Sequence, residues 1–138
     1  MTVELVSRFP VDDHELSALH ARAFHSRVQP APWRERLQRH ALTWVGAFDA
    51  GRLVGFVQVC WDGGAHAFLL DTAVDPQWRH RSIGRRLVEA AAADAAAAGC
   101  DWLHVDFEPH LEEFYLSRCG FTPTRAGLLR LDSTDSLR

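Results

Sequence analysis

Three apolar runs follow one another directly in the middle of the chain, and this succession constrains the fold more than any other feature. The runs cover Thr43 to Phe48, Leu53 to Cys60 and His66 to Val74. They have the length and apolar character of β-strands, and only turn-forming residues separate them, Asp49-Ala50-Gly51-Arg52 and then Gly63-Gly64. Connections this short join antiparallel neighbours. We therefore expect an antiparallel meander at the centre of a sheet.

Helical patterns precede the meander. A predicted edge strand at Thr2 to Phe9 leads into a helix that Asp12 or Asp13 can cap, with Leu16, Leu19 and Ala23 recurring at helical spacing. After two prolines, Trp33 to His40 has the pattern of a second, short helix.

The chain after the meander alternates helix and strand. The predicted elements are a helix at Ser82 to Ala98, a strand at Trp102 to Phe107, a helix at Leu111 to Cys119 and a β-like segment around Ala126 to Leu131. A helix between two strands favours a right-handed crossover with parallel pairing. We expect one mixed α/β sheet with helices on both faces. A chain of 138 residues, 47% of them hydrophobic, is long enough for one core, so residues 1–138 are predicted to form a single domain.

Composition argues against several classes of function. A formal net charge of -3 gives no overall attraction to nucleic acid or to anionic lipid. No apolar run approaches the ~20 residues that cross a bilayer, and the first residues, which include Glu4, do not resemble a signal peptide, so we expect a cytoplasmic protein without a membrane partner. The three cysteines have no CxxC spacing and the eight histidines no HExxH or HxH cluster, so no metal site is predicted.

The first chemical signal lies between the third predicted strand and the alanine-rich helix. The strand ends near Val74, a basic loop follows, and the loop opens directly onto the helix at Ser82. A helix start presents unpaired N–H groups and the positive end of the macrodipole, which together attract anions. Gly84 would let an anion approach the backbone closely. The alternative is an ordinary solvated helix start whose arginines face water.

The stretch Arg79-His80-Arg81-Ser82-Ile83-Gly84 resembles the cofactor motif of the GNAT superfamily of N-acetyltransferases, with Ser82 where the first glycine is usual. The order of elements agrees with that family over essentially the whole chain. The resemblance implies a GNAT-like fold, with a mostly antiparallel sheet splayed between its fourth and fifth strands, and acetyl-CoA as cofactor. It also implies a cofactor site that includes the backbone of Val74, a wall residue at Phe114 and the residues of the turn, which are Arg79, His80, Arg81, Ser82, Ile83, Gly84 and Arg85.

A second match lies at Leu111 to Phe121, which resembles the aromatic pair, short helix and Gly-Phe near the end of the family's domain. Tyr115 is the single tyrosine of the chain. A phenol holds its proton at neutral pH and can deliver it to a leaving thiolate, so we expect Tyr115 to be the catalytic acid. The alternative is a ring that only packs against the helix.

The catalytic base is less clearly indicated, because several carboxylates are candidates. Glu108 ranks first and stands where many GNAT proteins carry asparagine. Asp71 ranks second; it interrupts an apolar strand, and in polyamine-type relatives it matches the second member of an acidic pair, with Leu70 replacing the first, so it could instead bind a cationic substrate. Asp106 ranks third and would share one face of a regular strand with His104 and Glu108. His66 and His110 are outside candidates, and the open alternative is that this face meets solvent or an arginine.

Together these features predict an N-acetyltransferase that transfers an acetyl or other acyl group from acetyl-CoA to a primary amine of a small molecule, by direct attack in a ternary complex. Five tryptophans and the acidic candidates favour a cationic or aromatic amine. The alternatives are an acetyltransferase for a protein or peptide amine, and a non-catalytic acyl-CoA sensor. An exposed sheet edge makes a homodimer plausible.

Overall fold

The computed structural model describes residues 2–132, and it divides into two compact units, Met1–Val105 and Asp106–Arg138. Each unit is described by itself. The helices and strands of the first unit are β1 (Glu4–Ser7), α1 (Asp13–Ala23), α2 (Trp33–His40), β2 (Ala41–Asp49), β3 (Arg52–Trp61), β4 (His66–Val74), η1 (Pro76–Trp78), α3 (Ile83–Ala97) and β5 (Trp102–His104). The second unit contains η2 (Pro109–Leu111) and η3 (Glu113–Arg118).

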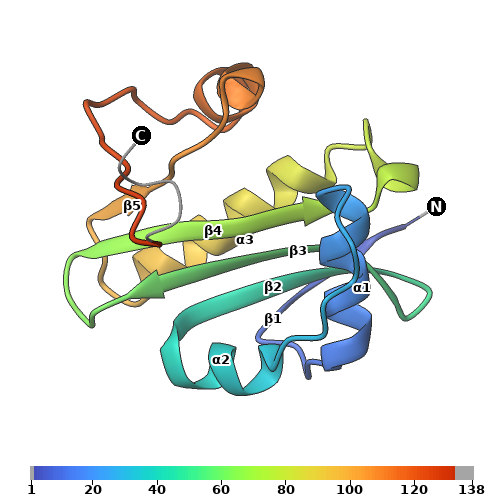
Figure 1. Ribbon diagram of the computed structural model, residues 1–138. Helices are drawn as coiled ribbons and strands as arrows, with labels where there is room; N and C mark the ends of the chain where they lie inside the picture. The colour runs from blue at the N-terminus through green and yellow to red at the C-terminus, as the bar shows by residue number, and fades with distance from the viewer. Residues whose placement is uncertain (1, 133–138) are drawn as a thin grey trace. The chain divides into compact units, whose positions relative to one another are not determined.

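The first unit is built on a five-stranded sheet in the order β1-β2-β3-β4-β5 (Figure 1). The first four strands pair antiparallel, and β4 pairs with β5 in parallel. The predicted meander and the predicted parallel crossover are therefore both confirmed. The pairing of β4 with β5 stops at Phe68 and His104, although β4 runs on to Val74. β4 thus continues past the end of β5 at the place where the splay between these strands was expected.

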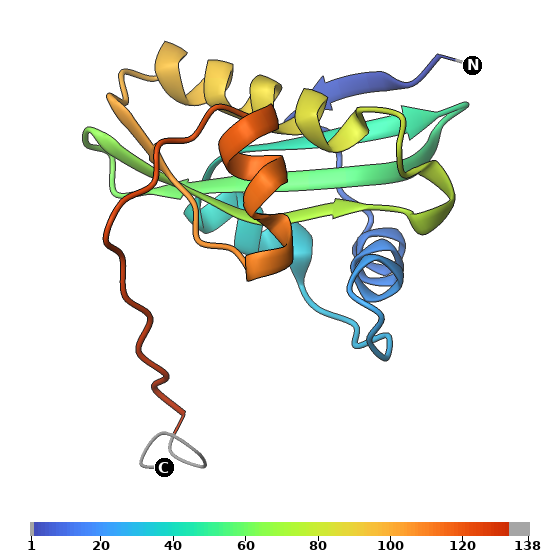
Figure 2. The same ribbon diagram turned by 90° about the horizontal axis from the view of Figure 1, so that it is seen from above.

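Helices cover both faces of this sheet, with α3 on one face and α1 and α2 on the other (Figure 2). The face under α1 and α2 holds an apolar cluster of Phe9, Leu16, Leu19, Trp33, Leu37, Leu53 and Phe56. On the opposite face α3 approaches Gly55 so closely that an added Cβ would lie 3.0 Å from Leu87 Cδ1 and 3.1 Å from Ile83 Cγ2. Gly55 therefore allows α3 to sit directly on the sheet, which fixes the position of its first turn.

A β-bulge interrupts β4. Gln58 of β3 lies opposite Leu70 and Phe56 lies opposite Ala73, so two residues of β4, Asp71 and Thr72, stand opposite Val57. Asp71 adopts φ = 58°, in the left-handed region that few residues other than glycine enter. A bulge re-aims the side chain that it carries. Asp71 consequently reaches partners on the α1 face, as described below.

The end of the chain departs from three expectations. The strand predicted at Trp102 to Phe107 ends at His104. The predicted helix at Leu111 to Cys119 forms as a 3-10 turn followed by a π-helix, with Cys119 N–H donating to the Phe114 carbonyl. The prediction of a β-like segment at Ala126 to Leu131 is wrong within residues 2–132, since none of the paired strands includes it. Its leucines, Leu128, Leu129 and Leu131, are 80–89% exposed, and a strand needs a partner for its backbone groups.

Candidate functional site

The turn before α3 has an unusual backbone. After η1, His80 adopts φ = 64° and Ser82 adopts φ = 60°, both in the left-handed region. Ser82 is the N-cap of α3, yet its side chain makes no capping hydrogen bond to the helix. The first N–H groups of a 15-residue helix are therefore left without a side-chain acceptor at the N-cap. Such a helix start can receive the oxygens of an anion.

Contacts to α1 hold this turn in place. The buried carboxylate of Asp75, 2% exposed, accepts a hydrogen bond from Arg22 Nε at 3.0 Å and one from the Gln77 N–H at 3.0 Å. Arg79 Nη2 donates to the Ala23 carbonyl at 3.1 Å. The turn is thus fixed on both sides of η1.

Trp78, which belongs to the same turn, has cationic side chains around its ring, one from β3 and one from the turn. The guanidinium groups of Arg52 and Arg81 lie 5.2 Å and 5.9 Å from its ring centroid. The buried Trp78 Nε1 has no hydrogen-bond partner among the described atoms. Arg85 lies farther along the helix and approaches Glu89 at 3.7 Å. The basic character expected of this turn is therefore present in the structure.

The predicted cofactor residues fall into four groups. The side chains of Arg79, His80, Arg81, Ser82 and Arg85 are exposed or partly exposed at the turn. Ile83 is 2% exposed and packs in the core, so only its backbone N–H is available to a ligand. Val74 and Gly84 are half-buried, at the end of β4 and in the first turn of α3. Phe114 belongs to the second unit.

Asp71 lies in a hydrogen-bond network on the α1 face. Its Oδ2 accepts from Gln58 Nε2 at 2.7 Å, and its Oδ1 is 3.1 Å from Nε2 of His20. Burial would raise the pKa of the Asp71 carboxyl, but the hydrogen bonds from His20 and Gln58, with the charges of His20 and Arg36, outweigh it and lower the pKa below the ordinary value. Asp71 is therefore a stable anion rather than a ready proton acceptor.

The same network changes the character of Cys60, whose Sγ lies 3.3 Å from Gln58 Oε1. Burial first, and then the Asp71 anion, raise the pKa of the Cys60 thiol. A thiol in this setting is a poor nucleophile at neutral pH. Covalent catalysis through Cys60 is not favoured.

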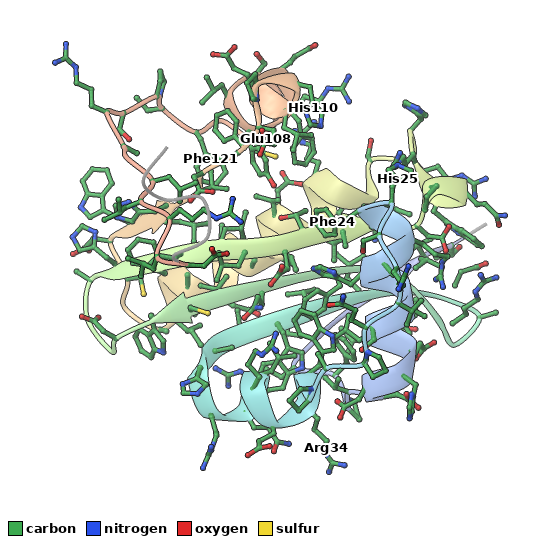
Figure 3. All side chains as sticks on the ribbon, viewed as in Figure 1. Phe24, His25, Arg34, Glu108, His110 and Phe121 are labelled. Carbon is green, nitrogen blue, oxygen red and sulfur yellow. The ribbon has the colours of Figure 1, made fainter. Side chains whose placement is uncertain are left out.

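His20 also lines a pocket of about 280 Å³ beside the last turn of α1. The other lining residues come from α1, from the α1–α2 connection and from the start of α2: Ser17, Ala21, Ser26, Arg27, Gln29, Ala31 and Trp33. Figure 3 shows Phe24 and His25 at this end of α1. Sequence reasoning did not identify His20 or Gln58, because a lone histidine on an amphipathic helix and a lone glutamine in a strand carry no motif.

Tyr115 lies in the π-helix of the second unit and is 6% exposed. Its ring packs among Phe107, Phe114 and Phe121, with centroids 5.1, 4.8 and 5.9 Å away. The packing expected of an aromatic residue is thus present. A π-helix is rare and occurs often at functional sites, which leaves the catalytic expectation open to experiment.

The remaining base candidates are exposed. Glu108 and Asp106 belong to the second unit, in which Figure 3 labels Glu108, His110 and Phe121. In the first unit His104 Nε2 lies 2.7 Å from His66 Nδ1 and the His104 ring stacks on Phe68. Across residues 2–132, no group of three metal-ligating side chains comes together, and no helix is long and apolar enough to cross a membrane.

Residues 13–121 match the acetyltransferase (GNAT) family. The chain is 28% identical over 108 residues to serotonin N-acetyltransferase 2, chloroplastic, of Oryza sativa subsp. japonica. This alignment covers 76% of the chain and 54% of the rice protein, so the chain spans about half the length of that curated relative. Among solved structures, a Trypanosoma brucei acetyltransferase is 20% identical with a TM-score of 0.77, over 96% of this chain and 100% of that one. An aminoglycoside N-acetyltransferase in complex with CoA is 18% identical with a TM-score of 0.75, over 95% of each chain.

Proposed function

Because the chain belongs to the GNAT acetyltransferase family, we propose that it is an N-acetyltransferase that transfers an acetyl group from acetyl-CoA to the primary amine of a small molecule. The observation that carries this proposal is the start of α3, where the left-handed Ser82 leaves backbone N–H groups uncapped at the end of a basic turn. A pyrophosphate provides the oxygens that such a helix start can bind.

The residues of the turn fit a pyrophosphate in charge as well as in backbone geometry. The N–H groups from Ile83 to Arg85 would donate to its oxygens, and the side chains of Arg81 and Arg85 would balance its negative charge. Arg79 would act in part through the shape of the turn, because it also donates to the Ala23 carbonyl.

The free stretch of β4 supports a place for the pantetheine arm. From Leu70 to Val74, β4 continues beyond its last pair with β5. Among residues 2–132, no strand pairs with the β5 side of this stretch, so its backbone groups can hydrogen-bond to an amide-containing arm. The backbone of Val74 would contribute at its end, next to the turn.

Bound acetyl-CoA supplies the acyl group as an activated thioester. The acceptor amine forms the new C–N bond while the C–S bond breaks and sulfur keeps the electron pair. Tyr115 would donate its phenolic proton to that sulfur and would regain a proton as the amine nitrogen loses one. The π-helix that carries Tyr115 and the aromatic rings around it support a fixed orientation for the hydroxyl group.

A small-molecule acceptor is supported by the pocket beside His20, whose volume of about 280 Å³ lies just below the range for small-molecule sites and leaves room for a small amine. The names of the rice relative and of the CoA-bound structural neighbour both refer to N-acetylation of amines that are not proteins. The rings of Trp33 and Phe24 near this pocket would favour an aromatic or cationic amine.

The direct test is release of free thiol from acetyl-CoA in the presence of a panel of small amines and of peptides with a free N-terminus, combined with calorimetry of CoA binding. The proposal expects CoA binding and thiol release that depends on a small amine. Binding without release for any acceptor would favour a sensor, whereas release with peptides alone would contradict the small-molecule assignment.

A further inference from the structure

Three residues from three separate elements meet on the α1 face of the sheet: His20 of α1, Gln58 of β3 and Asp71 in the bulge of β4. His20 Nε2 lies 3.1 Å from Asp71 Oδ1, and Gln58 Nε2 donates to Asp71 Oδ2 at 2.7 Å. We propose that His20 accepts the proton that the acceptor amine must lose, and that Asp71 and Gln58 are positioning residues that hold it in the required tautomer. This inference rests on the proposed function, because it assigns a proton step within that reaction.

The tautomer follows from the chemistry of the partner. The pKa of the Asp71 carboxyl is lowered, mainly because the hydrogen bonds from His20 and Gln58 overcome the effect of burial, so the group is a carboxylate at neutral pH. A carboxylate only accepts hydrogen bonds, so the nitrogen that faces it, Nε2, carries the hydrogen. In neutral His20 the lone pair is therefore on Nδ1. That nitrogen is the proton acceptor.

The backbone of Asp71 is strained in a way that serves this arrangement. Leu70 faces the α1 side opposite Gln58, and in a regular strand the next residue would face α3. The bulge and the left-handed φ of 58° bring the Asp71 carboxylate to the α1 side instead. A strained residue persists only where its surroundings hold it, and such residues cluster at functional sites. The contacts from Gln58 and His20 hold it here.

His20 stands at the wall of a pocket that an amine can enter. It is one of the residues that line the pocket of about 280 Å³, and its side chain is 30% exposed. Its ring packs between Phe24 and Trp33, with centroids 4.6 and 5.3 Å away, which fixes the ring plane. His20 is thus both open to a ligand and restrained by its neighbours.

The charged and titratable groups around His20 come from three elements and from the α1–α2 connection. Asp71 of β4 faces it directly, and Cys60 of β3 is linked through Gln58. Arg36 of α2 lies over the Trp33 ring at 4.8 Å and acts on Asp71, and Arg27 from the α1–α2 connection lines the pocket. Asp71 is the anion in contact with the ring.

The proton step is balanced as follows. An N–H bond of the acceptor ammonium breaks and its electron pair stays on the amine nitrogen as the lone pair that attacks the thioester. Nδ1 of His20 forms a new N–H bond with that proton, so one positive charge passes from the ammonium group to the imidazolium. The imidazolium then gives the proton to water and returns to its neutral form.

The test compares His20→Gln with the wild-type chain and with His14→Gln, a matched control that replaces an exposed histidine of the same helix. Thiol release with the best amine of the panel is followed from pH 5 to pH 9, and CoA affinity is measured by calorimetry. We expect His20→Gln to lose about 10²-fold or more in kcat, with CoA affinity unchanged and the acidic limb of the pH profile removed. His14→Gln should behave as the wild type does.

A second variant keeps the test decisive if His20→Gln does not fold. In Asp71→Asn the carboxylate that fixes the tautomer of His20 is lost, so kcat should fall by a smaller factor while the KM for the amine and the CoA affinity stay within a factor of about two. The inference is overturned if His20→Gln retains wild-type kcat and pH profile, or if Asp71→Asn retains wild-type kcat. A wild-type chain that neither binds CoA nor releases thiol would instead contradict the proposed function itself.

Discussion

Arg79 donates from Nη2 to the carbonyl of Ala23 at 3.1 Å, so the turn before α3 is tied to the last residue of α1. The resemblance assigned Arg79 to the cofactor turn, and this contact gives the same residue a structural role. His20 lies three residues before Ala23 on the same helix, so the bond links the candidate cofactor turn to the helix that forms part of the wall of the candidate acceptor pocket.

The left-handed backbone of Ser82 predicts that glycine would be better tolerated at this position. A non-glycine residue in the left-handed region destabilises the folded state by roughly 1 kcal/mol. Glycine avoids this strain, but its more flexible unfolded chain offsets part of the gain in stability. We expect Ser82→Gly to raise the free energy of unfolding by up to about 1 kcal/mol in urea denaturation. Ser82→Ala, which keeps the strain, is the control. A destabilised Ser82→Gly would show that the serine side chain has a role in the turn.

The first turn of α3 predicts a sharp effect of charge at Gly84. Replacement by glutamate adds bulk and a negative charge where the pyrophosphate would bind, so calorimetry should show CoA affinity reduced by about 10²-fold or more. Gly84→Ala adds a methyl group without charge and should cause a smaller loss. Unchanged affinity in Gly84→Glu would place the phosphates elsewhere.

Tyr115→Phe tests the proposed acid without removing the ring that packs among Phe107, Phe114 and Phe121. Loss of the proton donor should lower kcat by about 10²-fold while CoA affinity stays within a factor of about two. Steady-state kinetics and calorimetry on the same preparation separate the two effects. A fully active Tyr115→Phe would assign the residue to packing alone.

The lowered pKa of Asp71 predicts a pH-dependent contribution to stability. A carboxyl with a depressed folded-state pKa stabilises the fold at pH values above its ordinary pKa of 3.8, and the contribution is lost as the pH falls through the lower folded-state value. The difference in unfolding free energy between the wild type and Asp71→Asn should therefore be constant above about pH 5 and should shrink toward pH 2. Urea denaturation at several pH values measures it. A difference that grows as the pH falls would contradict the assigned direction.

The order of elements in the first unit could be predicted because its signals are local. The turn at Asp49 to Arg52 and the alanine-rich run of α3 define the meander and the crossover without reference to distant residues. Ser82 stands where the first glycine of the family's motif is usual, and in the structure it adopts the positive φ that glycine enters most easily.

The Asp71 network could not be predicted, because it depends on a one-residue bulge and on contacts across 13 and 51 positions of sequence. A regular strand would have placed Asp71 on the α3 side, away from His20. The β-like segment predicted at Ala126 to Leu131 was wrong for a related reason. Its apolar pattern favours a strand, but a strand forms only where a partner strand is present. Three expectations from the sequence stay predictions: a role of Glu108 or Asp106 as catalytic base, a cytoplasmic location and a homodimer.

The bulge also changes which residues of β4 face α1, so that the alternation of side chains in the second half of the strand is the reverse of that in the first half. Leu69 lies opposite Val59 on the α3 side, whereas Ala73, four residues later, lies opposite Phe56 on the α1 side. In an uninterrupted strand these two residues would share a face. Deleting one residue at Asp71 or Thr72 would therefore make the strand regular and leave Ala73 opposite Phe56. The single residue opposite Val57 would then face α3, and the carboxylate would lose its place beside His20.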